Sequence, residues 1–419
     1  LTAELTSLTR LVAALVPFVS AATVAFAAAQ EEPEGLPRLV GLLLVFAGAM
    51  ELVVISADLV TLLIGWEAMG AISWALIGHR WRRPEAMPSA GYAFVATRAG
   101  NLGLFLALLS CLAATGSAGF AALDALTGAT ATLAALGVVV AAAAKGGQVP
   151  FAPWLFRAMD GPTSVSALLH SSTMVAAGGF LLARLHPQLG DAAGFAPAAI
   201  SIGLATALAG GLVAARQMHA KRLLAASTSS QVGLMIAAAG AGWPAVAVLH
   251  LVAHALLKAA LFFAAGLAHA RTGSFDLRDM RLGRALPIAG LLMAVSAASL
   301  AGVPPLAGGW TKEEVLKALA HLSPWLAAAG LMAGGLSAAY AVRFAAMAYA
   351  PGDRTEAARP SLAATGASAV LVTATLALST LWLPAVHGTV AGALGAALPQ
   401  TQPALTVASL AAVALGAGA

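Results

Sequence analysis

Long apolar stretches separated by short polar segments follow one another along almost the whole chain. About 20 residues of α-helix span the hydrocarbon core of a bilayer, and these stretches have lengths of that order. The strands of a membrane barrel would instead show alternating segments of about ten residues. The pattern therefore predicts an all-α, polytopic transmembrane helical bundle. Its expected spans are residues 9–29, 38–56, 58–79, 89–115, 130–149, 162–185, 195–215, 219–240, 244–270, 285–303, 306–321, 325–350, 361–383 and 403–419.

Two of these spans contain residues that break a helix. The first ends in "KGGQVPFAPWL" and the second follows "GVPPLAGGW", and glycine and proline at membrane depth interrupt the helical hydrogen bonds. Each break has a lysine beside it, Lys145 and Lys312. Interrupted segments in corresponding places are typical of an internally duplicated transporter whose site lies near the breaks. The separation of the two lysines suits a repeat of five spans, so a duplication is our hypothesis.

Composition supports a membrane protein. The chain has 419 residues, of which 60% are hydrophobic and 9% charged, whereas a soluble domain carries about 25% charged residues. Its one cysteine, Cys111, permits no internal disulfide and no thiolate metal or iron–sulfur set. The opening "LTAELTSLTRLVAALVPF" has no basic n-region and no small-residue cleavage site, so we expect no signal peptide.

The charge distribution predicts the orientation. A net charge of +5 could suggest nucleic acid, but the basic residues lie in short loops between spans, which favours a role in membrane topology and no nucleic-acid partner. The loops on the opposite side carry mainly aspartates. We therefore expect the basic side to be cytoplasmic and the protein to be a multi-pass protein of a bacterial inner (cell) membrane. The basic loops are 79–84, 216–222 and 270–284.

Many ionisable groups lie within the apolar spans. A charge at the bilayer centre costs at least about 2.5–3.5 kcal/mol, so such groups indicate function. In "VLHLVAHALLKAALFF" they recur every fourth residue, which places them on one helix face about 6 Å apart, a spacing that suits a proton relay with one water between groups. The groups are Glu67, Lys145, His170, His250, His254, Lys258 and Lys312.

Structural interpretations remain open for several of these groups. Glu67 and Lys145 could form a buried ion pair, and His170 could be a hydrogen-bonded core histidine. Lys221 and Arg222 begin a span and could extend to the membrane interface.

Four further charged residues have their own expectations. We expect Arg98 to anchor a loop or a carboxylate, because a guanidinium does not release its proton in proteins. We expect Glu313, Glu314 and Lys317 on the wet face of a half-helix.

Metal and cofactor sites are disfavoured. His250 and His254 have the spacing of helical zinc ligands, but "HLVAH" lacks the glutamate of a zinc-protease motif, no third ligand is evident and Lys258 lies one turn on. No phosphate loop, dinucleotide fingerprint, haem or flavin motif is visible. We therefore expect no cofactor, no metal and no redox site in this chain.

Five ordered segments resemble the signature segments of the antiporter-like, proton-pumping membrane subunits of respiratory complex I, with the chain-L branch the most similar. Related proteins serve in multisubunit sodium/proton antiporters, membrane-bound hydrogenases and bicarbonate-accumulating complexes. The resemblance covers about residues 5–350. The segments are "LLIGWEAMGAISWALIGHRWRRPEA", "AAAAKGGQVPFAPWLFRAMDGPTSVSALLHSSTMVAAGGFLLARL", "AKRLLAASTSSQVGLM", "LHLVAHALLKAALFFAAG" and "GVPPLAGGWTKEEVL".

The resemblance implies a role for each matching residue. Glu67 would partner Lys145 in a first half-channel, and His170 would join that lysine to the centre. Lys312 would serve the exit half-channel. The residues implied for the central line are Lys221, His250, His254 and Lys258.

The implied fold is two inverted five-helix repeats, each with a discontinuous helix. The expected units are a leading helix and loop at 1–37, repeats at 38–190 and 191–352, and additional helices at 353–419. Two departures stand out: His219 where the family often has an aspartate, and Asn101 in "RAGNLG" in place of an aspartate. Two leading spans and the long lateral helix of the chain-L branch are not identified.

The function expected from this resemblance is proton translocation, driven by redox chemistry in other subunits of a complex I-like pump. Whether the parent complex is an NADH:quinone oxidoreductase-like or hydrogenase-like enzyme stays open. Expected partners are other membrane subunits, the lipid bilayer and protons, with sodium not excluded. A cation/proton antiporter or bicarbonate-accumulating complex is the first alternative, although Glu67 in "WEAMG" weighs against the bicarbonate branch. A non-conducting scaffold is the second.

Overall fold

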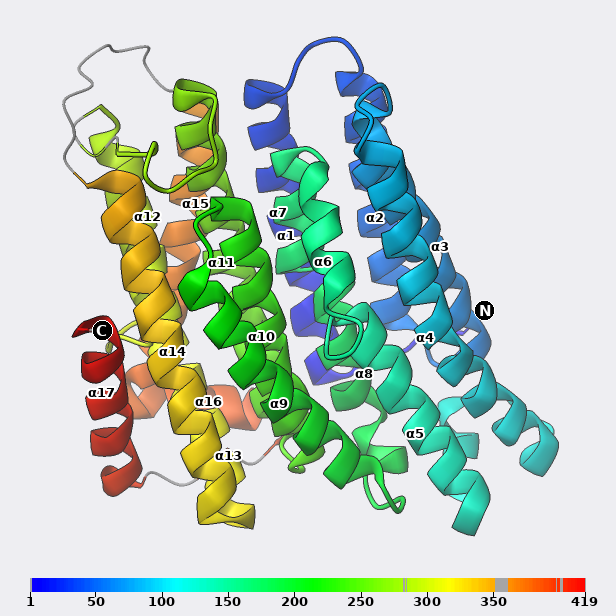
Figure 1. The fold of residues 1–419 in the computed structure, drawn as a ribbon. Helices are drawn as coiled ribbons and strands as arrows, with labels where there is room; N and C mark the ends of the chain where they lie inside the picture. The colour runs from blue at the N-terminus through cyan, green and yellow to red at the C-terminus, as the bar shows by residue number, and fades with distance from the viewer. Residues whose placement is uncertain are drawn as a thin grey trace.

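The computed structural model describes residues 2–281, 283, 285–350, 361–396, 398–399 and 402–418. Within these residues the chain is a bundle of α-helices joined by turns and short 3-10 segments, without a β-strand, which confirms the predicted all-α fold (Figure 1). The helices are α1 (Ser7–Gln30), α2 (Leu36–Ile55), α3 (Leu59–Ile77), α4 (Ala86–Thr115), α5 (Gly128–Lys145), α6 (Pro153–Arg157), α7 (Thr163–Ser171), α8 (Met174–Leu189), α9 (Phe195–Arg216), α10 (Ala220–Gly240), α11 (Pro244–Thr272), α12 (Pro287–Ala301), α13 (Ala307–Leu322), α14 (Pro324–Tyr349), α15 (Leu362–Leu378), α16 (Pro384–Leu394) and α17 (Pro403–Gly418).

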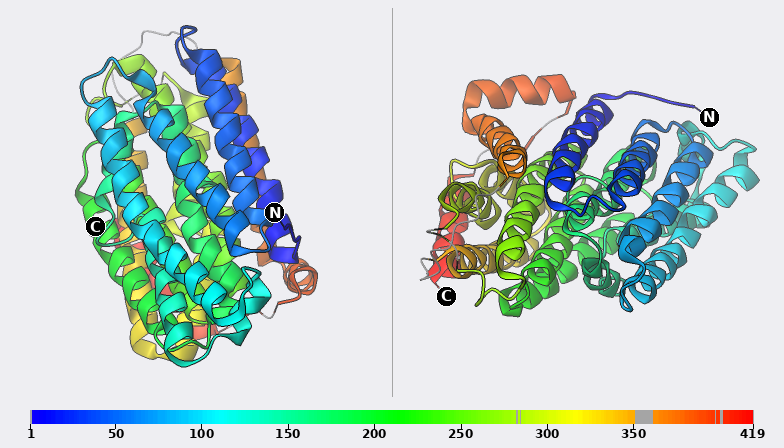
Figure 2. Two further views of the ribbon diagram at one scale, coloured as in Figure 1. Left: turned by 90° about the vertical axis from the view of Figure 1, so that its right-hand side faces the viewer. Right: turned by 90° about the horizontal axis from the view of Figure 1, so that it is seen from above.

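In the described part of the chain, 11 helices are long and apolar enough to cross a membrane, so the protein is a multi-pass integral membrane protein. Each predicted span coincides with a helix or with a pair of consecutive helices. The sequence did not predict α16, which lies across the other helices at one end of the bundle (Figure 2). Residues 353–360, 397, 400–401 and 419 of the expected C-terminal unit lie outside the described residues.

The first predicted interruption begins after Lys145, the last residue of α5. Gly147 has a φ of +61°, and a Cβ added there would lie 1.8 Å from Leu155 Cδ1. The Ser229 hydroxyl on α10 donates to the Gly147 carbonyl (2.5 Å). A side chain of a neighbouring helix thus satisfies backbone that the break frees, as a bilayer interior requires.

The second interruption separates α12 from α13, where the sequence predicted two complete spans. Gly302 has a φ of +101°. At the start of α13, the Ala307 backbone N–H donates to the Ser379 hydroxyl (2.9 Å). The helices lie at opposite ends of the bundle and are the halves of one discontinuous crossing (Figure 1).

A third interruption was not predicted. The sequence indicated one span over 162–185, but the helix breaks at Ser172 and Thr173 between α7 and α8. Thr173 has a ψ of −102°, and its hydroxyl donates to the Leu168 carbonyl (2.6 Å). A side-chain hydrogen bond competes with the helical ladder here without glycine or proline.

The most buried helices hold many of the polar and charged residues of the interior. The apolar windows of α7–α8, α10 and α11 are 100% buried, whereas those of α4 and α9 are 39% buried. Small residues bring α9 and α10 into backbone contact, because a Cβ on Gly203 would lie 2.5 Å from the Gly233 carbonyl oxygen. The outer helices therefore separate the centre from lipid (Figure 2).

The loops predicted to be cytoplasmic lie at one end of the bundle. His219, before α10, forms a backbone bridge with Asp276, after α11. Glu31 after α1 and Arg80 after α3 line the same cavity as Phe275. These basic loops therefore share a face, as the charge pattern predicted.

Candidate functional site

The eight residues predicted for the site occupy α3, α5, α7, α10, α11 and α13. Seven of them are at most 6% exposed. The exception is Glu67 on α3, whose side chain is 20% exposed. The residues are Glu67, Lys145, His170, Lys221, His250, His254, Lys258 and Lys312.

Glu67 pairs with two residues of α4. A guanidinium N–H of Arg98 donates to Oε2 of Glu67, and the amide of Asn101 donates to Oε1 (2.7 Å). The amide oxygen of Asn101 accepts from the indole N–H of Trp66 (2.8 Å). Arg98 therefore anchors a carboxylate, as predicted, and Asn101 holds that carboxylate as a neutral donor.

Lys145 ends α5 beside Glu67 without touching it. Its Nζ donates to the Trp66 carbonyl (2.6 Å) and lies 4.5 Å from the centroid of the Trp66 ring, a cation–π distance. The Glu67 charge acts on this ammonium, but no ion pair within 4.0 Å joins these two described residues. The interpretation as a buried ion pair is therefore wrong for this arrangement.

Lys221, at the start of α10, is buried beneath the segment that follows α6. Its Nζ donates to the carbonyls of Met159 (2.6 Å) and Gly161 (2.7 Å), so the side chain is held inside the bundle. The lysine lines a cavity of about 470 Å³ at the basic face, together with Glu31 and Asp160. A wide polar space therefore reaches one of the predicted residues.

His219 lies outside the spans, next to Lys221. Its Nδ1 accepts the backbone N–H of Arg222 (3.4 Å), and its ring lies 5.3 Å from that of Phe275. Burial, with Arg222 and Lys221 nearby, lowers the pKa of His219 to about 4. The side chain is therefore neutral near pH 7 and does not supply the negative charge of an aspartate.

The face of α11 with the four-residue spacing contacts several neighbouring helices. Nζ of Lys258 donates to the Ser227 hydroxyl on α10 (2.6 Å). Nε2 of His254 lies 3.2 Å from the His170 carbonyl on α7 and donates to it. The helix thus joins two other central helices through polar contacts.

His250 extends the face toward α13. Its Nδ1 lies 2.9 Å from the hydroxyl of Thr311, the residue before Lys312. Nζ of Lys312 donates to the Leu300 carbonyl at the end of α12 and to the Ser337 hydroxyl on α14. The second interruption is therefore tied to α11 on one side and to α14 on the other.

The alternative that His170 is a hydrogen-bonded core histidine does not match its ring. Both of its ring nitrogens are buried without a hydrogen-bond partner among the described side chains and backbone, as are Nε2 of His250 and Nδ1 of His254. The His170 ring lies between those of Trp154 (6.0 Å between centroids) and Phe262 (5.8 Å). Buried polar atoms of this kind are normally bonded to water.

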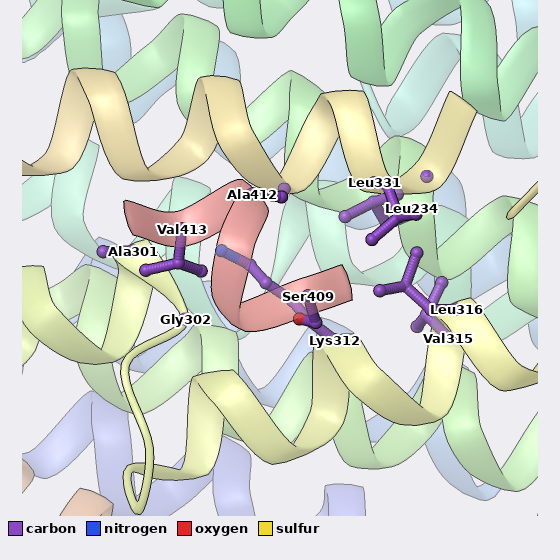
Figure 3. A pocket seen from close by; sticks show the side chains of 12 residues that line it. Leu234, Ala301, Gly302, Lys312, Val315, Leu316, Leu331, Ser409, Ala412 and Val413 are labelled. Carbon is purple, nitrogen blue, oxygen red and sulfur yellow. The ribbon is translucent and has the colours of Figure 1, made fainter. Parts of the chain in front are cut away.

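The cavity beside Lys312 is small. It has a volume of about 10 Å³, close to the minimum for one water molecule, and Ser409 and Val413 of α17 form part of its wall (Figure 3). Residues of α17 therefore lie on one side of the space beside Lys312.

The expectation for Glu313, Glu314 and Lys317 is wrong, because all three are buried. Nζ of Lys317 lies 2.8 Å from Glu314 and 3.2 Å from Glu313, and the Thr406 hydroxyl of α17 donates to Glu313 (2.7 Å). Their i,i+3 and i,i+4 spacing was the available signal for an ion-pair cluster.

Several buried groups lie close enough to interact electrostatically through the centre of the bundle. These interactions link positions that lie far apart in the sequence, on α7, α10, α11 and α13. The described residues contain no group of three or more His, Cys, Asp or Glu side chains that could hold a metal ion. The arrangement instead suits proton exchange between coupled groups. The interacting pairs are Lys221 with His170, Lys258 with His170 and His254, and Lys312 with His250 and Lys258.

Sequence comparison finds relatives among respiratory membrane proteins. A family model described as NADH:quinone oxidoreductase/Mrp antiporter, transmembrane region, matches residues 56–337. The NADH-ubiquinone oxidoreductase chain 5 of Pongo abelii is 35% identical over 305 residues, which are 72% of this chain and 51% of the relative. The chain thus spans about half the length of the curated relatives it matches.

Two solved structures are similar in fold. A chain of the Mrp complex from Dietzia sp. DQ12-45-1b matches 99% of this chain and 48% of its own length, with 29% identity and a TM-score of 0.87. A chain of the membrane-bound sulfane sulfur reductase, an archaeal respiratory membrane complex, matches 97% of this chain and 83% of its own length, with a TM-score of 0.81. At 22% identity the second match supports the fold alone.

Proposed function

Because the chain belongs to the family of NADH:quinone oxidoreductase and Mrp antiporter membrane subunits, we propose that it moves protons across a membrane along its buried lysines and histidines. One observation carries the proposal: buried groups that can bind protons lie on α10, α7, α11 and α13, and α11 contacts α7 through His254 and α13 through His250. Lysine and imidazole can both bind and release a proton, and coupled groups do so in an order set by their neighbours' charges. Burial within the bundle keeps this exchange away from lipid.

We assign proton uptake to the basic face. The cavity of about 470 Å³ extends from the basic face to Lys221. Its walls carry both carboxylates, such as Asp160, and guanidinium groups, and Glu31 is paired with Arg80 (2.7 Å). The excess of basic loops supports a cytoplasmic location for this face in a bacterial cell membrane. Protons therefore start from the cytoplasm.

Water completes the relay between the side chains. Groups four residues apart on α11 are about 6 Å apart, too far for a direct hydrogen bond but suitable for one bridging water. The ring nitrogens of His170, His250 and His254 without protein partners are the positions where such water would bind. Hydration of this line is a requirement of the proposed mechanism.

Glu67 and Lys145 control the charge at the first interruption. In this arrangement Arg98 and Asn101 hold the Glu67 carboxylate, and Lys145 binds a backbone carbonyl. A second arrangement, with Glu67 against Lys145, would change the charge felt by the central groups. The order α2–α8 followed by α9–α14 fits the two five-span units, 38–190 and 191–352.

The driving force comes from other subunits. The curated relatives that the chain matches include NADH-ubiquinone oxidoreductase chain 5, about half of whose length the chain spans. We therefore propose that the protein is a membrane subunit of a complex I-like assembly whose redox chemistry takes place in other chains.

A subunit of a cation/proton antiporter is the second candidate. The match to a chain of the Mrp complex over 99% of this protein favours it, and the same line of groups would carry the protons. Replacing sodium by an impermeant cation in reconstituted vesicles separates the two. Unchanged proton movement supports the redox-driven pump, whereas a requirement for sodium supports the antiporter.

Substitution of the buried lysines tests the proposed function. In membrane vesicles that contain the native complex, Lys258→Met and Lys145→Met should each abolish proton movement while assembly persists. Lys221→Met should do the same, whereas Arg222→Met, a matched change at the exposed neighbouring position, should leave proton movement unchanged. Normal proton movement in Lys258→Met would rule out the proposed path.

A further inference from the structure

We propose that the Tyr340 hydroxyl on α14 belongs to a second proton connection between Lys258 and Lys312, parallel to the route through His250. The inference rests on the proposed function and adds a relay residue that no sequence motif indicated. Tyr340 is fully buried between α10 and α14. On the route through His250, the imidazole contacts the hydroxyl of Thr311, the residue before Lys312.

Lys258 and Lys312 each donate a hydrogen bond to a serine of the second connection. Nζ of Lys258 donates to the Ser227 hydroxyl on α10 (2.6 Å). Nζ of Lys312 donates to the Ser337 hydroxyl on α14. All four side chains are buried. The two lysines are therefore already joined to the two helices that the connection crosses.

Gln231 and Tyr340 close the gap between these helices. Nε2 of Gln231 donates to the Tyr340 hydroxyl oxygen (2.9 Å). The side chains of Ser230 and Ser337 lie close to that hydroxyl, while their own hydroxyls donate to the carbonyls of Ala207 (2.8 Å) and Leu300 (2.6 Å). Ser230 is three residues from Ser227 on one face of α10, a separation of about 5–6 Å that one water can bridge.

The hydroxyl groups have the chemistry that a relay needs. In a concerted transfer an N–H bond of Lys258 breaks, each hydroxyl oxygen accepts one proton on a lone pair while its own proton leaves, and an N–H bond forms on a neutral Lys312, so that every hydroxyl ends neutral. The serine hydroxyls, which donate to backbone carbonyls in this arrangement, turn toward the connection for the transfer. The Gln231 amide does not exchange protons in this way and acts as a positioning residue that fixes the Tyr340 oxygen. Proton transfer would pass from Ser227 through water to Ser230, Tyr340 and Ser337.

The alternative is a hydrogen-bonded clamp that only ties α10 to α14, since buried polar groups need partners in any case. A clamp and a relay differ in their response to loss of the hydroxyl when the aromatic ring is kept. Tyr340→Phe removes the relay atom and leaves the packing in place. Tyr349→Phe is the matched control, because the Tyr349 hydroxyl on the same helix donates to the Ala264 carbonyl (2.6 Å), away from both lysines.

The test is proton movement by the native complex in membrane vesicles. Tyr340→Phe and His250→Asn should each lower the rate about 3-fold to 10-fold, and the double variant should fall to the level of Lys258→Met. The remaining rate of each single variant should carry a different solvent deuterium isotope effect, since a different route is in use. Tyr349→Phe should retain the normal rate.

Two results would overturn the inference. A normal rate for Tyr340→Phe in both the wild-type and the His250→Asn backgrounds would make Tyr340 a clamp. Complete loss in each single variant would place the two residues in series on one route. A normal rate for Lys258→Met would contradict the proposed function itself. Failure of the proposed function and failure of the Tyr340 connection therefore give different results.

Discussion

Replacing Lys317 with methionine should destabilise the protein by about 3–5 kcal/mol, the usual loss when one partner of a buried ion pair is removed. Nζ of Lys317 lies 2.8 Å from Oε1 of Glu314 and 3.2 Å from Oε1 of Glu313, and all three side chains are buried. Glu313 would keep the Thr406 hydroxyl, at 2.7 Å. Most of the loss therefore comes from Glu314, whose Oε2 already has no hydrogen-bond partner among the described residues.

Thermal melting of the purified protein in detergent measures this effect. At about 2 °C per kcal/mol, the Tm of Lys317→Met should fall by about 6–10 °C. The exposed Arg222→Met should change the Tm by no more than about 1 °C. The double variant Glu314→Leu/Lys317→Met should recover most of the loss, because apolar side chains of similar size replace a buried ion pair at little cost. Two results would contradict this reasoning: an unchanged Tm for Lys317→Met, or a Tm of the double variant below that of Lys317→Met. Either would show that Glu313, Glu314 and Lys317 are not desolvated as described.

Two further predictions concern the loop before α10 and the first interruption. Because the pKa of His219 is lowered from 6.5 to about 4, the unfolded protein binds more protons between these values, so stability should be present above about pH 6.5 and be lost as the pH falls toward 4. Melting of the wild type and of His219→Asn, which retains a capping side chain, should show a smaller loss in the variant; equal losses would assign the effect to other groups. Gly147→Ala should sharply reduce the yield of folded protein, because its Cβ would lie 1.8 Å from Leu155. The control Gly128→Ala, at a φ of +54° with no atom within 4 Å, should cost only conformational strain of about 1–2 kcal/mol. Equal yields for the two variants would refute the steric explanation.

The parts of the fold that depend on local sequence could be predicted. Apolar length sets the spans, and glycine and proline marked the interruptions after Lys145 and before Lys312. The break at Ser172 and Thr173 has no such marker, because a threonine side-chain hydrogen bond replaces the helical one. The local sequence therefore predicted a helix break only where glycine or proline interrupts the helix.

The candidate site was predictable in residue type but not in contacts. Spacing placed His250, His254 and Lys258 on one face of α11, yet their partners come from helices 31 to 84 positions away in the chain. The prediction for Lys317 failed for the same reason. Charged residues on a half-helix indicate a water-exposed face, but neighbouring helices cover Lys317 and bury it. Packing between distant helices decides both cases.

The two ends of the proposed proton line differ in a way that a pump requires. At Lys221 a cavity of about 470 Å³ reaches the basic face, whereas the space beside Lys312 has a volume of about 10 Å³ and is lined in part by Ser409 and Val413 of α17. A path open at both ends would let protons return down their gradient and would dissipate the driving force. A path open at one end only can load protons from that side and must change conformation to release them on the other. On the proposed function, this difference favours loading from the basic face, and release past Lys312 would then require movement of α17 or of the α12–α13 interruption.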